Sequence, residues 1–277
     1  MTTFRESDVP GEVVAPTLRE AVRDEFRRIR RPPYSVIWCI VINFVLVTTF
    51  WCVPVPVLKE FMFSLHKTFW FPLVMASWLI SDVPATNELA PDRWRVLAAL
   101  DDEAAIDRLL RAKHIALWMI TTPMTVIAAV VVGIVTGDWI TMVIAIVWVA
   151  SAPLCSVGIA CSVGVRWPYH ELPLAVRWRE RARWKPILLR WGILIVLPYA
   201  LVPTIAVIGL VPSLLAALLA RTVGVHGSGF DSMVLAGLVV AIPMTLWIWH
   251  RATAYAARTT VRRAAILRAY LEDPLLG

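Results

Sequence analysis

The sequence has 277 residues, of which 59% are hydrophobic and 17% are charged, and its formal net charge is +7. Soluble domains contain about 25% charged residues, so this composition excludes an ordinary soluble protein and indicates a membrane protein. The arginines flank long apolar runs and do not form one face. This argues against nucleic acid as a partner and favours anionic lipid headgroups.

The segment 1–34 contains a predicted amphipathic helix over Thr17–Arg31. Its apolar face is formed at helical spacing by Leu18, Val22, Phe26 and Ile29. Its other face carries Arg19, Arg23, Arg27 and Arg30. We expect this helix to lie on the inner leaflet of the membrane and to end at Pro32 and Pro33. It is either a membrane anchor only or an elbow that also contacts a cytoplasmic partner.

Six apolar runs are long enough to cross the hydrocarbon core, which takes about 20 residues of helix. Backbone polar groups find no water in lipid, so these runs predict an all-α membrane helical bundle. The predicted transmembrane domain covers residues 35–250. Its six spans are Ser35–Val57, Phe61–Ser81, Ile115–Val135, Ile140–Val165, Trp191–Pro212 and Ser232–His250.

The cationic residues predict the orientation of these spans. Of the 27 Lys and Arg residues, 24 fall in four segments on one side of the bundle, which are 1–34, 82–114, 166–190 and 251–277. The positive-inside rule makes this side cytoplasmic, so both termini are expected in the cytoplasm and the protein in the inner membrane. The first apolar run is too long for a signal peptide, so we expect no cleaved leader.

The cytoplasmic loop 82–114 has the pattern of a folded unit. A short apolar stripe is followed by the acidic corner Asp101–Glu103, and a second apolar stripe comes after it. Acidic residues are favoured at helix N-termini, so the corner is expected to start a second short helix. The sequence therefore predicts a compact knob of two helices joined by an acidic turn.

Two further segments between spans have distinct compositions. The loop 166–190 is rich in Arg and Trp, which is typical of an anchor at the membrane interface. The outer segment 213–231 contains an apolar stretch that is too short to span, followed by three glycines. We interpret it as a re-entrant or interfacial helix.

Motifs for enzymatic chemistry are absent from the sequence. It contains no G-x-x-x-x-G-K, no H-E-x-x-H and no G-x-S-x-G. We therefore expect no catalytic residue, no cofactor and no ATP-binding site in this chain. The four cysteines fall within spans at spacings of neither a zinc site nor a redox pair, so we expect them to be packing residues and expect no metal site.

No acidic residue falls inside a span, which argues against a proton-coupled transporter. Asn43 is the most polar side chain deep in a span, and it either joins two helices or lines a substrate path. His66 is either an interfacial residue or part of a gate. With Thr48 and Trp78, these residues are the candidates for a substrate path, and the apolar interior favours a lipophilic or amphipathic cargo.

Several short motifs resemble those of permease subunits in type-two ATP-binding-cassette exporters. Asn87 and Asp92 stand five residues apart, an apolar run follows at 96–100, and Leu109–Lys113 reads Leu-Leu-x-x-Lys. The triplet Trp167-Pro168-Tyr169 matches an aromatic-Pro-Tyr motif at the end of the fourth span. The chain departs from the pattern where Asp102 and Glu103 replace a Ser-Pro pair, and where Ile106 and Asp107 replace basic residues.

The resemblance implies a six-span permease that pairs with a second permease, identical or different, and with two separate ATPase subunits. A helix in the loop between the second and third spans would dock on the ATPase and transmit its motion. The residues implied in this coupling are Arg93, Arg95, Leu100, Asp101, Asp102, Glu103, Ile106, Asp107 and Arg108.

Two other functions remain open from the sequence. A non-transporting scaffold or assembly subunit would also lack a polar pathway, and it would need no ATPase partner. A membrane enzyme such as a lipid transferase would need acidic residues or histidines that converge at the interface. The acidic corner is the sole candidate for such a site, and it has no histidine beside it.

Overall fold

The computed structural model describes residues 14–32, 34–52, 67–80, 87–168 and 211–273. Every regular element in these ranges is helical, which confirms the all-α prediction for the described part of the chain. The elements are α1 (Leu18–Ile29), α2 (Ser35–Cys52), α4 (Lys67–Leu79), the 3-10 turn η1 (Ala90–Asp92), α6 (Arg93–Ala99), α7 (Glu103–Thr136), α8 (Trp139–Gly164), α11 (Val211–Thr222), α12 (Ser228–Arg262) and α13 (Ala264–Glu272).

Three of these helices are long and apolar enough to cross a membrane. They are α7, α8 and α12, with 34, 26 and 35 residues. The predicted third and sixth spans lie within α7 and α12, and α8 covers all but the last residue of the fourth. The chain is therefore a membrane protein. Helices α2 and α4 occupy parts of the first two predicted spans, whereas nearly all of the fifth lies outside the described residues.

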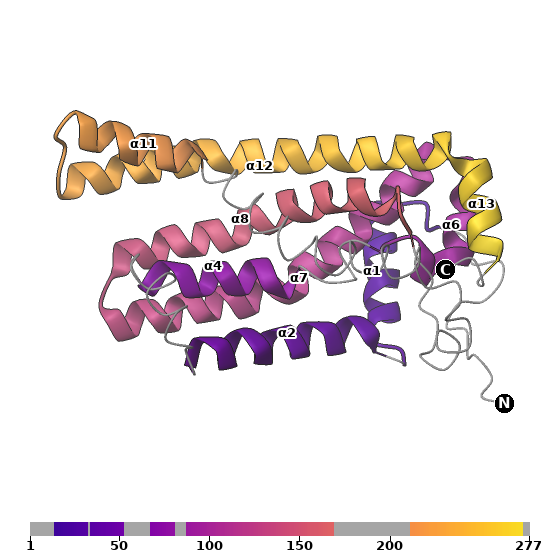
Figure 1. The fold of residues 1–277 in the computed structure, drawn as a ribbon, viewed down its shortest axis with the longest axis horizontal. Helices are drawn as coiled ribbons and strands as arrows, with labels where there is room; N and C mark the ends of the chain where they lie inside the picture. The colour runs from indigo at the N-terminus through magenta and orange to yellow at the C-terminus, as the bar shows by residue number, and fades with distance from the viewer. Residues whose placement is uncertain (1–13, 33, 53–66, 81–86, 169–210, 274–277) are drawn as a thin grey trace, which may run out of the picture.

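The helices form one elongated bundle (Figure 1). Helices α2, α4, α7, α8 and α12 run along its long axis, and α1 and α13 cross this axis at one end, close to α6. We call this the arginine-rich end, because α1 and the last turns of α12 carry many of the arginines. The turns between α7 and α8 and between α11 and α12 lie at the opposite end.

The acidic corner does start a helix, as predicted. The side chain of Asp102 caps α7 by accepting hydrogen bonds from the backbone N–H groups of Ala104 and Ala105, at 2.8 and 3.2 Å. This helix is not short, however, because it continues without a break into the predicted third span. No proline or glycine interrupts residues 103–122, so the helix that leaves the knob and the helix that enters the membrane are one.

A similar difference affects the end of the last span. The prediction ended it at His250, but α12 continues to Arg262 before α13 begins. One face of this extension is buried, through Thr253, Ala256, Ala257 and Thr260. Leu267 and Leu271 of α13 then pack into the core that α6 and the start of α7 form at the arginine-rich end. The predicted basic tail is therefore folded against the predicted knob.

The segment predicted to be re-entrant forms α11 and the first turn of α12. The two helices pack side by side (Figure 1). Gly237 permits their close approach, because a Cβ atom there would lie 2.7 Å from the Cα atom of Ser213. No described residue shows whether this hairpin enters a membrane, so that part of the prediction stays a prediction.

Candidate functional site

An ion network lies buried at the arginine-rich end. Six ionisable side chains that meet between α1, the segment 87–95 and α7 are each at most 8% exposed, and they are Glu25, Glu88, Asp92, Arg95, Lys113 and His114. Taking charged groups out of water costs several kcal/mol per ion unless they are paired. The pairing of these residues therefore controls how the three elements fit together.

Helix α1 contributes Glu25 and Arg28. Thr17 caps this helix through a hydrogen bond from the backbone N–H of Glu20. The buried face consists of Ala21, Glu25 and Ile29, so it is rotated from the apolar face that the sequence predicted. Helix α1 packs against α7, so it contacts protein as well as facing outward.

The two α1 side chains join the helix to segment 87–95. Glu25 pairs with Arg28 one turn later, and its Oε2 lies 3.2 Å from Nη1 of Arg95. Nε of Arg28 lies 3.1 Å from Oδ1 of Asp92. Helix α1 and η1 are therefore fastened by pairs in which one arginine serves two carboxylates.

Asp92 is the centre of the network. Its Oδ2 lies 2.5 Å from Nζ of Lys113 on α7 and 3.6 Å from Nη1 of Arg95. Lys113 also donates a hydrogen bond of 2.8 Å to the backbone carbonyl of Glu88. One lysine thus ties both ends of segment 88–92 to the third predicted span.

The cations keep both carboxylates ionised. Burial by itself would raise the pKa of Asp92, but Lys113, Arg28 and Arg95 outweigh it and lower that pKa from 3.8 to about 2. Burial would likewise raise the pKa of Glu25, and Arg28 and Lys113 hold it below its usual value. Both groups are therefore charged at neutral pH, so their attraction to the neighbouring cations holds α1, segment 87–95 and α7 together.

His114 extends the network to α12. Its Nε2 lies 2.8 Å from Oε1 of Glu88, and its Nδ1 accepts a hydrogen bond of 3.0 Å from the indole N–H of Trp249. The indole is a donor only, so Nδ1 must carry no proton and Nε2–H donates to Glu88. Thr253 lies 3.4 Å from the same Nδ1, and the thiol of Cys161 on α8 lies beside Glu88 and His114. Three other elements, which are segment 87–92, α8 and α12, therefore converge on this histidine of α7.

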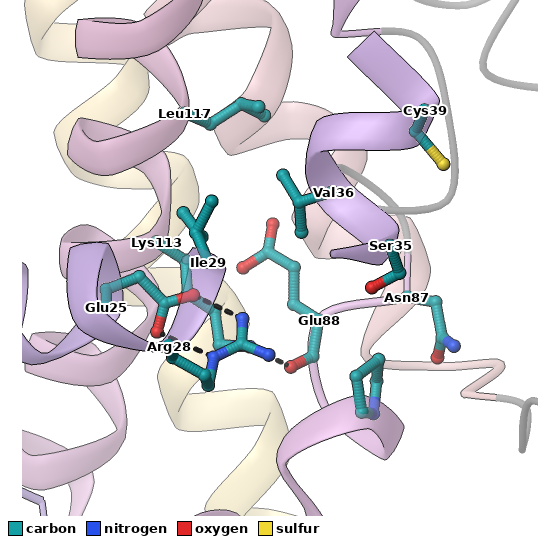
Figure 2. A pocket seen from close by; sticks show the side chains of 11 residues that line it. Glu25, Arg28, Ile29, Ser35, Val36, Cys39, Asn87, Glu88, Lys113 and Leu117 are labelled. Atoms are coloured by element: carbon teal, nitrogen blue, oxygen red, sulfur yellow. Dashed lines mark hydrogen bonds and ion pairs between the residues drawn. The ribbon is translucent and has the colours of Figure 1, made fainter. Parts of the chain in front are cut away.

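A pocket lies next to the network, between α1 and the start of α2 (Figure 2). Charged groups, including Glu25, Arg28, Glu88 and Lys113, line this pocket together with apolar groups, including Val36 and Leu117. Figure 2 shows the Glu88 side chain between Ile29 and Val36, so this carboxylate borders both the pocket and the histidine.

The acidic corner is held by the C-terminal helices. Oδ2 of Asp101 lies 2.8 Å from Nη2 of Arg268 on α13, and Oε1 of Glu103 lies 4.0 Å from Nε of Arg258 on α12. Both pairs are solvent-exposed, and the side chain of Asp101 is 79% exposed. Exposed pairs stabilise little, at about 0–1 kcal/mol, so a partner could replace them.

The predicted coupling residues fall into three groups. Arg95, Leu100 and Ile106 are buried and belong to the frame of the knob. Arg93, Asp107 and Arg108 are half-buried. Asp101, Asp102 and Glu103 are exposed, so of the nine residues these three are the most accessible to another subunit.

The predicted substrate-path residues are not gathered around a described cavity. Asn43 is buried on the face of α2 that packs against α4, where Ile40, Val47 and Met75 form a core. Trp78 borders the same core, and Thr48 lies one turn further along α2. His66 lies outside the described residues. The substrate path therefore stays a prediction.

Sequence reasoning missed Glu25, Glu88 and Cys161 as members of the network. Glu25 stood among arginines in a helix read as lipid-facing, and Glu88, His114 and Cys161 are far apart in the sequence and lie on different elements. Asp92 and Lys113 were noticed, but only through the family resemblance. A helical-wheel reading centred on Ala21 and Ile29 would have placed Glu25 on a protein-facing side.

Comparison with known proteins leaves the function to be argued from this site. No protein-family model, no curated protein and no solved structure matches the chain.

Proposed function

We propose that this protein is the transmembrane permease subunit of an ATP-driven exporter of the ATP-binding-cassette class. It crosses the inner membrane six times with both termini in the cytoplasm. It pairs with a second permease copy and with separate nucleotide-binding ATPase subunits. The cargo is lipophilic or amphipathic, because the spans are apolar and carry no buried carboxylate in their interiors.

One observation carries the proposal. Asp92 and Lys113, both in the motifs that resemble the exporter permeases, form a buried ion pair at 2.5 Å although 21 residues separate them. The pair fastens the segment before α6 to α7, the helix that runs from the knob through the third predicted span. A movement of the knob would thereby also move α7 and the third predicted span, because no flexible loop separates them.

The length of α7 supports this mechanism. At 1.5 Å per residue its 34 residues extend about 51 Å, from the acidic corner to the far end of the bundle. ATP binding would close the two ATPase subunits and push on α6 and the start of α7. The ion network makes α1 and the knob move together with α7, which would tilt the bundle and switch access from the inside to the outside.

The test is purification from the native membrane in mild detergent, followed by identification of the associated proteins. We expect a stoichiometric ATPase with a phosphate loop. Asp101→Arg should weaken its association. Because Asp101 also holds Arg268, the double variant Asp101→Arg, Arg268→Asp is the matched control.

The control separates two explanations. If the ATPase contacts the acidic corner directly, the double variant also loses it, since the acid remains absent from position 101. Recovery in the double variant would mean that the acid acts only by holding α13 in place. Absence of any ATPase under several gentle conditions would contradict the proposal and favour a scaffold, which would be defined by the complex that co-purifies.

A further inference from the structure

Glu88, His114 and Cys161 form a group of metal-ligand types that the ion network does not explain. One ligand atom from each side chain lies within 4.8 Å of the other two, and all three residues are buried. They come from segment 87–92, α7 and α8, so only the fold brings them together. Ligand atoms around a tetrahedral zinc ion lie roughly 3–4 Å apart, so small side-chain movements would complete the geometry.

The second oxygen of Glu88 points to a ligand. His114 occupies Oε1, whereas Oε2 is buried and accepts no hydrogen bond from an N–H or O–H group of any described residue. The neighbouring polar group is the thiol of Cys161, which is at best a weak donor. A buried carboxylate oxygen left without a strong partner is unfavourable, and a metal ion would satisfy it.

We propose that Glu88, His114 and Cys161 bind a divalent ion of the zinc class, which links segment 87–92 to α7 and α8. A thiolate, an imidazole and a carboxylate together suit zinc better than the oxygen-seeking magnesium or calcium ions. The charges also balance, because a thiolate and a carboxylate neutralise a dication in a buried site. Glu88 also lines the pocket beside α1, which gives water and the ion a route to its carboxylate.

Binding requires a proton to move. Cys161 releases its thiol proton to solvent as the metal–sulfur bond forms. Nε2 of His114 must give up its proton to accept the metal, and the neutral ring then carries its proton on Nδ1. Nδ1–H cannot accept from the indole of Trp249, so that hydrogen bond breaks, and the hydroxyl of Thr253 at 3.4 Å becomes its acceptor.

The test measures metal bound to the purified full-length chain, prepared with a tag that contains no histidine and stripped with a chelator. We expect one zinc ion per chain, and with cobalt a thiolate-to-metal charge-transfer absorption. Cys161→Ser and Glu88→Gln should each weaken zinc binding at least 100-fold, more than the roughly 10–100-fold cost of losing a supporting residue. Cys155→Ser is the matched control, since Cys155 is a buried free cysteine on the same helix outside the cluster.

A second variant tests the proton shift. Trp249→Phe removes the N–H group that opposes a proton on Nδ1, so it should tighten zinc binding by about fivefold, the worth of one hydrogen bond. Unchanged or weaker binding in this variant would overturn the assignment of Nε2 as the ligand atom. Absence of stoichiometric zinc, or equal affinities in the folded Cys161→Ser and Cys155→Ser proteins, would overturn the site itself. These measurements of zinc binding do not depend on whether an ATPase partner exists.

Discussion

Asp92 is the residue on which the arginine-rich end depends most. It is fully buried and faces Arg28, Arg95 and Lys113, which come from three different elements. Removing one member of a buried ion pair leaves its partners charged and unpaired, and this is more costly than the pair is favourable. Substitution of one member of the network therefore destabilises the protein even if the intact network adds little net stability.

Asp92→Asn should lower the free energy of unfolding by about 3–5 kcal/mol, because three cations lose their shared carboxylate. Thermal unfolding of the purified protein in detergent measures the change. Asp24→Asn is the control, since Asp24 forms an exposed pair with Arg27 and its loss should cost less than about 1 kcal/mol. Equal effects of the two substitutions would show that the network is not a centre of stability.

The lowered pKa of Asp92 gives this contribution a defined pH dependence. A carboxyl group whose folded-state pKa is depressed stabilises the protein fully above its unfolded value and loses that contribution as pH falls through the folded value. The stability difference between the wild type and Asp92→Asn should therefore be constant above about pH 4 and shrink between pH 3.8 and about 2. A difference that already disappears near pH 6 would contradict the lowered pKa.

At the scale of elements, helix α7 is capped by Asp102, its first turns belong to the knob, and its later turns form the third predicted span. Asp102 is exposed, and its side chain satisfies two backbone N–H groups at the start of the helix. The same carboxylate lies in the surface that we propose contacts an ATPase. These two roles can be separated, because asparagine caps helices about as well as aspartate but carries no charge.

Asp102→Ala should reduce stability by about 1 kcal/mol through loss of the cap, and Asp102→Asn should leave it nearly unchanged. Thermal unfolding measures both variants. Association with the ATPase should weaken in both, since both lack the acid. If Asp102→Asn retained full association, the charge at this position would have no part in docking.

Several elements could be predicted from the sequence because their signals are local. The start of α1 at a threonine cap, the start of α2 at Ser35 and the start of α7 at the acidic corner follow from capping and hydropathy. Hydropathy does not predict how far α7 and α12 continue beyond the predicted spans, because packing against α1, α8 and α13 keeps these polar turns helical. The boundaries at 114 and 250 were therefore placed where composition changes and not where a helix ends.

The candidate site was less predictable than the fold. Asp92 and Lys113 could be found through short motifs, but Arg28, which pairs with Asp92, lies 64 residues before it and on another helix. The cysteines were read by their spacing along the chain, and spacing cannot show that Cys161 on α8 meets Glu88 and His114. Contacts between elements distant in sequence decide this site.

For the whole molecule, the proposed topology places the arginine-rich end in the cytoplasm and the turn after α11 outside. Ile266 lies at the arginine-rich end and Val223 in the turn after α11, and 64% and 68% of their surface is exposed. In intact cells a membrane-impermeant maleimide should label Val223→Cys and not Ile266→Cys. The unsubstituted protein gives the background, and labelling of Ile266→Cys would contradict the orientation.

The central claim is that an ATPase subunit docks on the acidic corner, and site-specific photocrosslinking in the native membrane tests it most directly. One photoreactive residue replaces Ala104, which is exposed beside the acidic corner and leaves its three acids in place, and a control replaces Val135, which is 80% exposed at the opposite end of the bundle. We predict a crosslink from position 104, and none from position 135, to a subunit that binds ATP. No such crosslink from position 104, or equal crosslinks from both positions, would contradict the account.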